Sequence, residues 1–262
     1  DKQRNVHGCN CGLADWTRCW RSSMLNTDKD IKSCQQCPHY APAFPYDRVT
    51  VTVTYWERPD SLARLQRSLQ QHLPDAKVLV EDTGGNLSAG RNRLIANTTT
   101  EFVIVMEEDF ELMKPSVIEL CRAVEILDTD KKISGVGGTC HENPQRKLWG
   151  HNYVRRGDNV AVVSSQRPIR VTPSGVRYLP CDLVLNWGLF RTEAFRQVPW
   201  NESFPIMEHK ERFWRSSQAG QEYAFLADLA VRHYRDRPSA VYNEGRRRNF
   251  NSLIQSTYGI RF

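Results

Sequence analysis

The chain has 262 residues, of which 40% are hydrophobic and 25% charged, and its formal net charge is +6. This is ordinary for a globular protein, and we expect one main domain. No stretch reaches the roughly 18 apolar residues of a membrane span, and the charged residues 1–4 are not a signal peptide, so we expect any anchor to lie outside this sequence. Basic residues gather near the end, at Arg246–Arg248, where they could hold phosphates or acidic sugars or form a solvated face. No nucleic-acid motif accompanies them, and we expect no nucleic-acid partner.

The first 37 residues hold five of the eight cysteines. Such density in a segment with little apolar periodicity requires disulfides or a metal. A zinc site would need a second cysteine pair at finger-like spacing, which this segment lacks, so disulfides are favoured. Because five is an odd number, one disulfide is expected to reach a core cysteine such as Cys140 or Cys181. The prolines in 38–45 indicate a linker, which predicts a cysteine-rich extension over 1–45 and a main domain over 46–262. The five cysteines are Cys9, Cys11, Cys19, Cys34 and Cys37.

Strand and helix signals then alternate along the chain. Residues 49–55 are β-branched and alternating, Leu62, Leu65 and Leu69 form one helical face, and Ser88 can cap a second helix. This alternation predicts a parallel sheet with right-handed crossovers, an α/β fold. The expected elements are strand 49–55, helix 59–73, strand 78–80, helix 88–96 and strand 102–106.

The second half follows a similar order with an interruption. Pro115 begins a helix with Cys121 on its inner face, so this cysteine is interpreted as a core thiol rather than a nucleophile. Residues 141–177 have weaker periodicity and many charges, as a substrate-side insertion would. The other expected elements are strand 133–138, an apolar run over 183–190, helix 207–217 and strand 223–233.

Three acids, Glu107, Glu108 and Asp109, directly follow the apolar strand 102–106. Burying like charges this closely is costly, so the carboxyl groups either titrate or bind a metal. Oxygen ligands at the carboxyl end of a strand suit magnesium or manganese holding a diphosphate. The alternative is a solvated acidic turn. Polar groups also follow other strands, at 54–58, at 81–82 and around Asn186, and a parallel sheet brings such strand ends together.

These segments carry a resemblance. The chain resembles the nucleotide-sugar domain of GT-A glycosyltransferases of the family-2 type, and within that group it is most similar to the ganglioside-type β1,4-N-acetylgalactosaminyltransferases. The likeness covers about 49–235 and implies a GT-A, Rossmann-like fold with a mainly parallel central sheet. Its motifs are residues 49–62, Asp82, 89–92, 107–110, Gly137-Gly138, Asn186 before 190–192, 209–213, and Asp228 five residues before His233.

The resemblance implies a metal site and a catalytic base. Asp109 matches the direct ligand of a divalent metal, with Glu107 and Glu108 as supporting groups, although relatives usually carry Asp where this chain has Glu. His233 matches the late histidine that completes the metal site. Glu211 matches the general base of inverting members, and Glu208 is the alternative.

The resemblance also implies a uridine site. Asp82 resembles the carboxylate that accepts from uracil, with Thr54 and Arg58 around the uridine. Arg91 would contact phosphate or ribose, and its alternative is a salt bridge with Glu81 or Asp82. Glycosylation sequons begin at Asn86, Asn97 and Asn201. The first is discounted because a glycan there would obstruct the donor.

The implied activity is inverting, metal-dependent transfer of a sugar from a UDP-sugar to a hydroxyl group of a glycan, glycolipid or glycoprotein. Manganese, or magnesium, is the expected cofactor, and N-acetylgalactosamine is the first expected sugar. One alternative is a sugar nucleotidyltransferase, although its glycine-rich phosphate loop is absent. The other is a non-catalytic sugar-binding relative, which would have no reason to retain Asp109, Glu211 and His233 together. We expect the soluble catalytic part of a type II membrane glycoprotein in the Golgi or ER lumen, with a homodimer as an option.

Overall fold

The computed structural model describes residues 44–142, 150–205, 208–234 and 250–262. Residues Tyr46–Phe262 pack against one another as one compact unit. The cysteine-rich segment lies outside the described residues, so its disulfides and the division at residue 45 stay predictions. Within the described ranges, no helix has the length and apolar character needed to cross a membrane.

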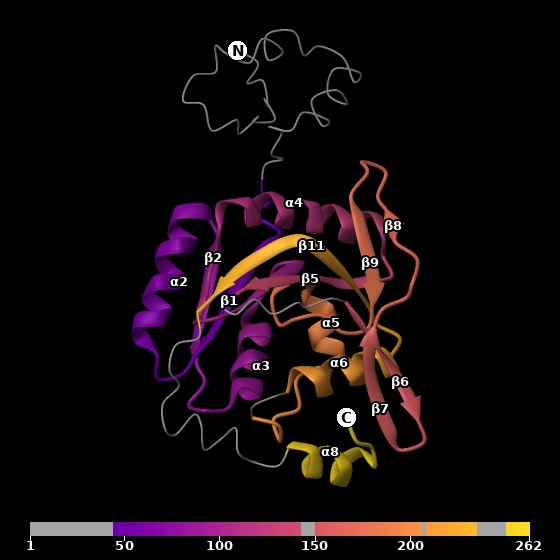
Figure 1. Cartoon of the computed structure of the whole chain (residues 1–262). Coiled ribbons are helices and arrows are strands. Elements are labelled where there is room, and N and C mark those ends of the chain that lie inside the picture. Colours follow the sequence, from indigo (N-terminus) through magenta and orange to yellow (C-terminus); the bar gives the residue numbers. More distant parts are fainter. Residues whose placement is uncertain (1–43, 143–149, 206–207, 235–249) are drawn as a thin grey trace, which may run out of the picture. The chain divides into compact units, whose positions relative to one another are not determined.

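The core of this unit is one large mixed sheet (Figure 1). Its strands lie in the order β2-β1-β3-β10-β5-β11-β9-β8, with β4 paired to β11, and β6 and β7 form a separate hairpin. The strands are β1 (Val49–Tyr55), β2 (Lys77–Asp82), β3 (Phe102–Glu107), β4 (Phe110–Glu111), β5 (Ile133–His141), β6 (His151–Arg156), β7 (Asn159–Ser164), β8 (Arg170–Val171), β9 (Arg177–Cys181), β10 (Gly188–Arg191) and β11 (Glu222–His233).

The predicted α/β class with a mainly parallel centre is confirmed. Strands β1 and β2, β1 and β3, and β5 and β11 pair in parallel. Strand β10 pairs antiparallel with both β3 and β5, so those two strands still run in the same direction. The carboxyl ends of β1, β2, β3, β5 and β11 therefore share one edge, where the amino end of β10 also lies.

Helices cover both faces of the sheet. Ile95, Phe195 and Phe213, from α3, α5 and α6, pack on Val103 and Val105 of β3 in one buried cluster. Helix α4 lies on the other side of the sheet from α5 and α6 (Figure 1). The helices are α2 (Pro59–His72), α3 (Leu87–Asn97), α4 (Lys114–Thr129), α5 (Thr192–Gln197), α6 (His209–Gln218) and α8 (Phe250–Tyr258).

Cys121 is buried in α4, as predicted for a core thiol. Burial raises the pKa of its thiol to about 12, which disfavours the nucleophilic thiolate. Cys140 and Cys181 are also buried. The cysteines proposed to pair with one of them lie outside the described residues, so that disulfide stays a prediction.

The predicted cap of α3 is wrong. The helix begins at Leu87, and the side chain of Asn86 caps it by accepting a hydrogen bond from the Ala89 amide at 3.0 Å. Ser88 is fully buried and instead donates to the Phe204 carbonyl at 2.6 Å. Asparagine is one of the strongest N-cap residues, so the helix starts before the position favoured from the sequence.

Two of the three sequon asparagines use the amide nitrogen to which a glycan would be attached. Asn86 Nδ2 donates to the Glu202 carbonyl at 3.1 Å, and Asn201 Nδ2 donates to the Tyr258 hydroxyl at 2.9 Å. Asn97, at the end of α3, is exposed. Because N-glycosylation replaces a hydrogen on this nitrogen, Asn97 is the sequon whose surroundings best accommodate a glycan.

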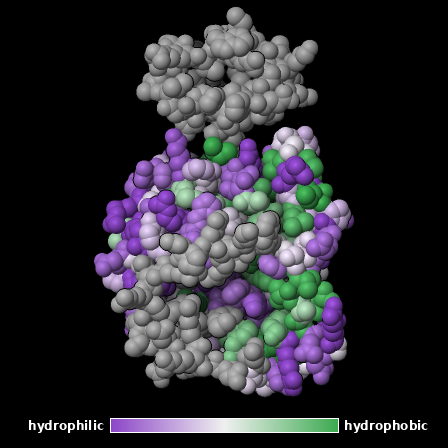
Figure 2. Space-filling view, in the orientation of Figure 1, coloured by the Kyte–Doolittle hydropathy of each residue, from purple (hydrophilic) through white to green (hydrophobic). Residues whose placement is uncertain are grey.

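The insertion predicted over 141–177 supplies β6, β7 and β8. Large hydrophobic side chains are exposed here, namely Val154 and Val163 in the hairpin and Ile169 and Val171 at β8. Figure 2 shows hydrophobic colour on the side of the molecule where these strands lie. This surface belongs to the insertion and not to the edge that carries the acids.

Candidate active site

The three acids after β3 lie at the shared edge, beside the segment that follows β1. Arg58 contacts Glu108 through Nε at 2.8 Å and Nη2 at 2.7 Å, and its Nη1 lies 2.8 Å from Asp109 Oδ2. The side chains of Glu108 and Asp109 are only 3% and 9% exposed, whereas that of Glu107 is 27% exposed. The acids are therefore not a solvated turn, and Arg58, predicted near the uridine, holds two of them.

A second arginine connects β3 to α6. The Nη2 of Arg91, in α3, lies 2.6 Å from Glu107 Oε1, and its Nη1 contacts Glu208, the N-cap of α6. Asn186, at the amino end of β10, donates to Glu208 Oε1 at 3.3 Å. Asn186 therefore lies at this edge as expected, but for another reason: it precedes β10, which runs antiparallel to its neighbours, and does not follow a parallel strand.

The alternative salt bridge of Arg91 with Glu81 or Asp82 is not formed. Arg93 takes Glu81 instead, with its Nε 2.6 Å from Oε1. Asp82 is exposed at the end of β2, and its Oδ1 accepts from the Gly84 amide at 3.0 Å. Its carboxylate is accessible to a ligand, and the role of accepting from uracil stays a prediction.

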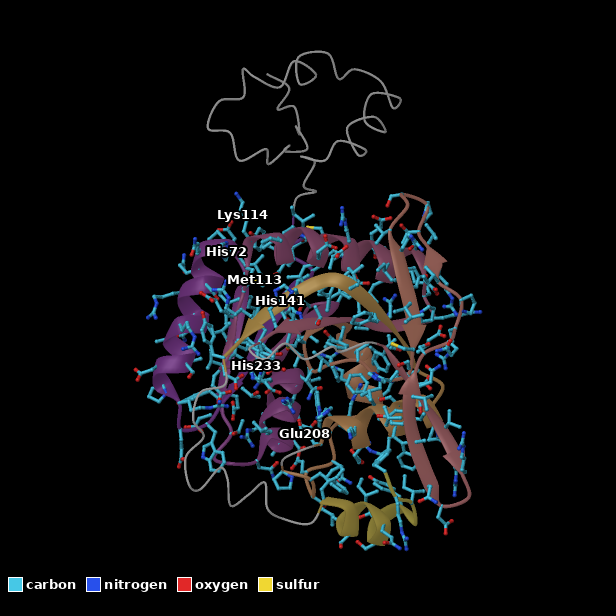
Figure 3. All side chains as sticks on the ribbon, viewed as in Figure 1. His72, Met113, Lys114, His141, Glu208 and His233 are labelled. Atoms are coloured by element: carbon cyan, nitrogen blue, oxygen red, sulfur yellow. The ribbon has the colours of Figure 1, made fainter. Side chains whose placement is uncertain are left out.

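His233 ends β11 and meets Asp109. Its Nε2 lies 3.3 Å from Asp109 Oδ2, while its Nδ1 lies 3.1 Å from Oε2 of Glu142, which follows β5. Phe110 packs against the imidazole edge to face, with ring centroids 5.5 Å apart. The pairing of His233 with Phe110 across β11 and β4 fixes this arrangement. Figure 3 labels His233 and Glu208, which reach the site from β11 and α6.

The carboxyl groups have perturbed acidities. Burial raises the pKa of Glu108 to about 7, against the opposing effect of Arg58 and with a further rise from Asp109. Burial also raises the pKa of Asp109, but hydrogen bonds and charge from His233 and Arg58 outweigh this and hold it below its ordinary value. The pKa of His233 is raised, because hydrogen bonding and charge from Asp109 outweigh the lowering caused by burial. Asp109 therefore stays an anion that attracts cations.

The residues present fit a divalent metal at Asp109 and His233. Asp109 Oδ1 and Thr54 Oγ1 are buried and have no hydrogen-bond partner in the described part of the chain. A buried carboxylate oxygen without a donor indicates that a ligand belongs there. The described residues contain no group of three or more His, Cys, Asp or Glu side chains that could hold an ion alone. The arrangement suits a cation that completes its coordination with water and substrate phosphate oxygens.

Glu211, the predicted base, is held by structural contacts. Its side chain is fully buried, Arg215 Nε lies 2.5 Å from its Oε1, and Tyr258 donates to the same oxygen. Glu208 instead contacts Arg91, which also holds Glu107 of the acidic motif. The role of Glu211 stays a prediction, and the geometry favours the alternative residue, Glu208.

Tyr258→Phe is expected to lower the free energy of unfolding by about 1.5 kcal/mol, because it removes a hydrogen bond to the buried carboxylate of Glu211. Urea denaturation of the purified chain measures this. The matched control is Tyr234→Phe, which removes a hydroxyl bonded to the more exposed Glu111 and should cost less. Equal effects of the two substitutions would show that the contact with Glu211 does not tie α8 to α6.

The sequence reasoning missed Glu142 and Trp187. Glu142 was hidden because strand β5 was expected to end at 138, whereas it continues to His141 and places Glu142 at the acidic edge. With the correct end of β5, the expectation that residues following parallel strands lie at one edge would have identified Glu142. Trp187 is fully buried beside Phe110, with ring centroids 6.5 Å apart, and no pattern in the sequence identified it.

No protein-family model matches the chain. Among solved structures, it is similar to S. aureus TarS 1–349 and to S. aureus TarS 1–349 in complex with UDP, each with a TM-score of 0.48, 11% identity and 71% of this chain covered. A structure of S. aureus TarS has the same TM-score, 0.48, and identity, 11%. The chain spans 60% of the TarS 1–349 chain and 36% of the other TarS chain. A likeness at this level says nothing about what this chain binds.

Proposed function

We propose that this chain is an inverting, metal-dependent glycosyltransferase that uses a UDP-sugar. The observation that carries the proposal is the pair Asp109 and His233 at the carboxyl edge of the sheet, with Asp109 Oδ1 buried and lacking a hydrogen-bond partner among the described residues. Open α/β sheets bind nucleotides at this edge. The motif resemblance over 49–235, which includes these two residues, supports the same activity.

The donor would lie along this edge. Thr54 and Asp82 are proposed to contact the uridine, as the resemblance implies. Arg91 is proposed to contact the diphosphate, and so is Arg58 in place of the uridine contact that the resemblance implies, because a guanidinium group matches phosphate geometry and both side chains already lie among the acids. Donor binding would then compete with the carboxylates for these two arginines.

Asp109 and His233 would hold manganese or magnesium, with Glu107 and Glu108 as supporting groups. The bound cation would supply positive charge for the departing diphosphate. An imidazole and a carboxylate together suit manganese. Before the donor binds, Arg58 would keep Glu108 and Asp109 in place.

The base is proposed to be Glu208 rather than Glu211. Its carboxylate would take the proton from the acceptor hydroxyl while the oxygen forms a bond to the anomeric carbon. The bond from that carbon to the diphosphate oxygen breaks, UDP leaves with the electron pair, and attack from the opposite face inverts the configuration. Glu208 suits this role because it lies with Arg91 and Asn186 at the sheet edge.

N-acetylgalactosamine is the first candidate sugar, and N-acetylglucosamine, galactose and xylose follow. The acceptor is proposed to be a hydroxyl group of a glycan on lipid or protein, approached past the 141–177 insertion. The proposed location is the Golgi or ER lumen, with this chain as the catalytic part of a type II membrane glycoprotein. A homodimer is compatible with this proposal.

A screen of UDP-sugars tests the function. UDP release is measured with each sugar nucleotide, with Mn²⁺, Mg²⁺ or EDTA, and with hydroxyl acceptors of several glycan classes. Metal-dependent release from one donor supports the transferase. Pyrophosphate release from UTP and a sugar phosphate would favour the nucleotidyltransferase instead. Saturable binding of a sugar without release of UDP from any donor would favour the non-catalytic alternative.

A further inference from the structure

Glu142 contacts His233 on the side of the imidazole opposite Asp109. The side chain of Glu142 is only 1% exposed, and its Oε2 lies 3.1 Å from His233 Nδ1. The register explains the contact. Arg232 in β11 pairs with His141 in parallel β5, so the residues that follow them, His233 and Glu142, lie at the same edge. Neither the sequence motifs nor the resemblance points to Glu142.

This contact decides which nitrogen of His233 faces Asp109. A carboxylate can only accept, so Nδ1 carries the hydrogen and donates it to Glu142. In the neutral ring, the lone pair of Nε2 then points to the side of Asp109 Oδ2, 3.3 Å away. Two acceptors at this separation need a positive charge between or beside them. A proton on Nε2 meets this need while no metal is bound, and a metal ion that also uses Asp109 would replace that proton.

The orientation of the His233 imidazole is restricted by its neighbours. Phe110 contacts it edge to face at an interplanar angle of 85°, and the two carboxylates occupy both ring nitrogens. Metal-binding histidines commonly donate their second ring nitrogen to a carboxylate, which fixes the tautomer and makes the ligand nitrogen more basic.

We propose that Glu142 is a positioning residue that orients His233 through Nδ1 so that Nε2, together with Asp109, receives the divalent cation. This inference rests on the proposed function only for the identity of the cation and its diphosphate partner. It predicts that Glu142 acts on metal affinity through His233 and not by contact with the donor or the acceptor.

The test measures Mn²⁺ affinity of the full chain by electron paramagnetic resonance of the free ion, with and without saturating UDP. Glu142→Ala should raise the Mn²⁺ dissociation constant about 10- to 100-fold, as the loss of such outer partners typically does. Glu142→Gln should have a smaller effect, because its amide oxygen can still accept from Nδ1. Glu111→Gln is the matched control, since this nearby carboxylate contacts Arg232 and Tyr234 and should leave the affinity unchanged.

A double-mutant comparison separates positioning from direct coordination. In a His233→Ala background, Glu142→Ala should cause no further loss of Mn²⁺ affinity. An equal loss in that background, or an affinity within twofold of the original in Glu142→Ala alone, would overturn the proposal. Nitrogen-15 spectra of the Mg²⁺- and UDP-loaded protein should show the proton of His233 on Nδ1, and a proton on Nε2 would overturn it as well.

The outcomes keep the two proposals apart. UDP binding and sugar transfer without Mn²⁺ uptake would end the role of Glu142 and the metal dependence, and would leave the sugar transfer itself standing. Mn²⁺ uptake that depends on Glu142 and His233, without UDP binding or transfer, would support the positioning role and contradict the transferase. Circular dichroism of each variant verifies that the lost affinity does not come from unfolding.

Discussion

Asp109→Asn is expected to lower turnover with the UDP-sugar on the order of 10³-fold and to weaken Mn²⁺ binding. The substitution removes the negative charge that Arg58 and His233 contact and that is proposed to hold the cation. Metal stabilisation of a developing charge is worth several kcal/mol, and each 1.36 kcal/mol is tenfold in rate. Steady-state kinetics over a Mn²⁺ titration measure both effects.

The matched control for Asp109→Asn is Asp128→Asn, which changes a partly exposed carboxylate paired with Arg48 at another part of the molecule. The control should keep turnover near that of the original chain at saturating Mn²⁺. Turnover that survives Asp109→Asn unchanged, and that needs no metal, would sink the proposed metal site.

Glu208→Gln is expected to lower turnover about 10²- to 10⁴-fold, the usual cost of losing a general base, while leaving UDP affinity nearly intact. The amide keeps the size of the side chain and can still accept from Asn186, but it cannot take a proton. Single-turnover kinetics combined with calorimetric UDP binding separate the chemical step from binding.

Glu211→Gln is the informative counterpart, because this carboxylate lies only three residues further along the chain. It should reduce stability through its contacts with Arg215 and Tyr258, and it should change turnover much less at a temperature where the protein is folded. A larger loss of turnover in Glu211→Gln would restore Glu211 as the base. An α-linked product from an α-linked donor would contradict inversion itself.

Much of the fold followed from local patterns. Apolar, β-branched runs predicted β1 and β3, whose central residues are buried, and leucines at helical spacing predicted α2. The acidic edge was also predictable, because parallel strands must place their carboxyl ends together whatever side chains they carry. This reasoning placed Arg58 and Asp109 in one region without knowledge of any contact, whereas Asn186 lies there because it precedes the antiparallel strand β10.

The solvent exposure of the side chains in β2 could not be predicted from its sequence. Its valines, Val78 and Val80, are 36% and 38% exposed because β2 lies at the edge of the sheet. Strand order follows from how the crossovers pack in three dimensions, and an apolar run has the same composition at the edge as in the centre.

The sequence by itself determined the α/β class, the order of most elements and the acidic edge with Asp109, because these depend on residue type and local periodicity. Only the tertiary structure distinguished Glu208 from Glu211. Both carboxylates were candidates from the sequence, but α6 begins at His209, which leaves Glu208 as the N-cap beside Arg91, while Tyr258 of α8 contacts Glu211. The contact of Glu142 with His233 likewise needs β5 and β11 to pair in one register. Contacts between distant segments depend on packing and register, which local sequence patterns do not specify.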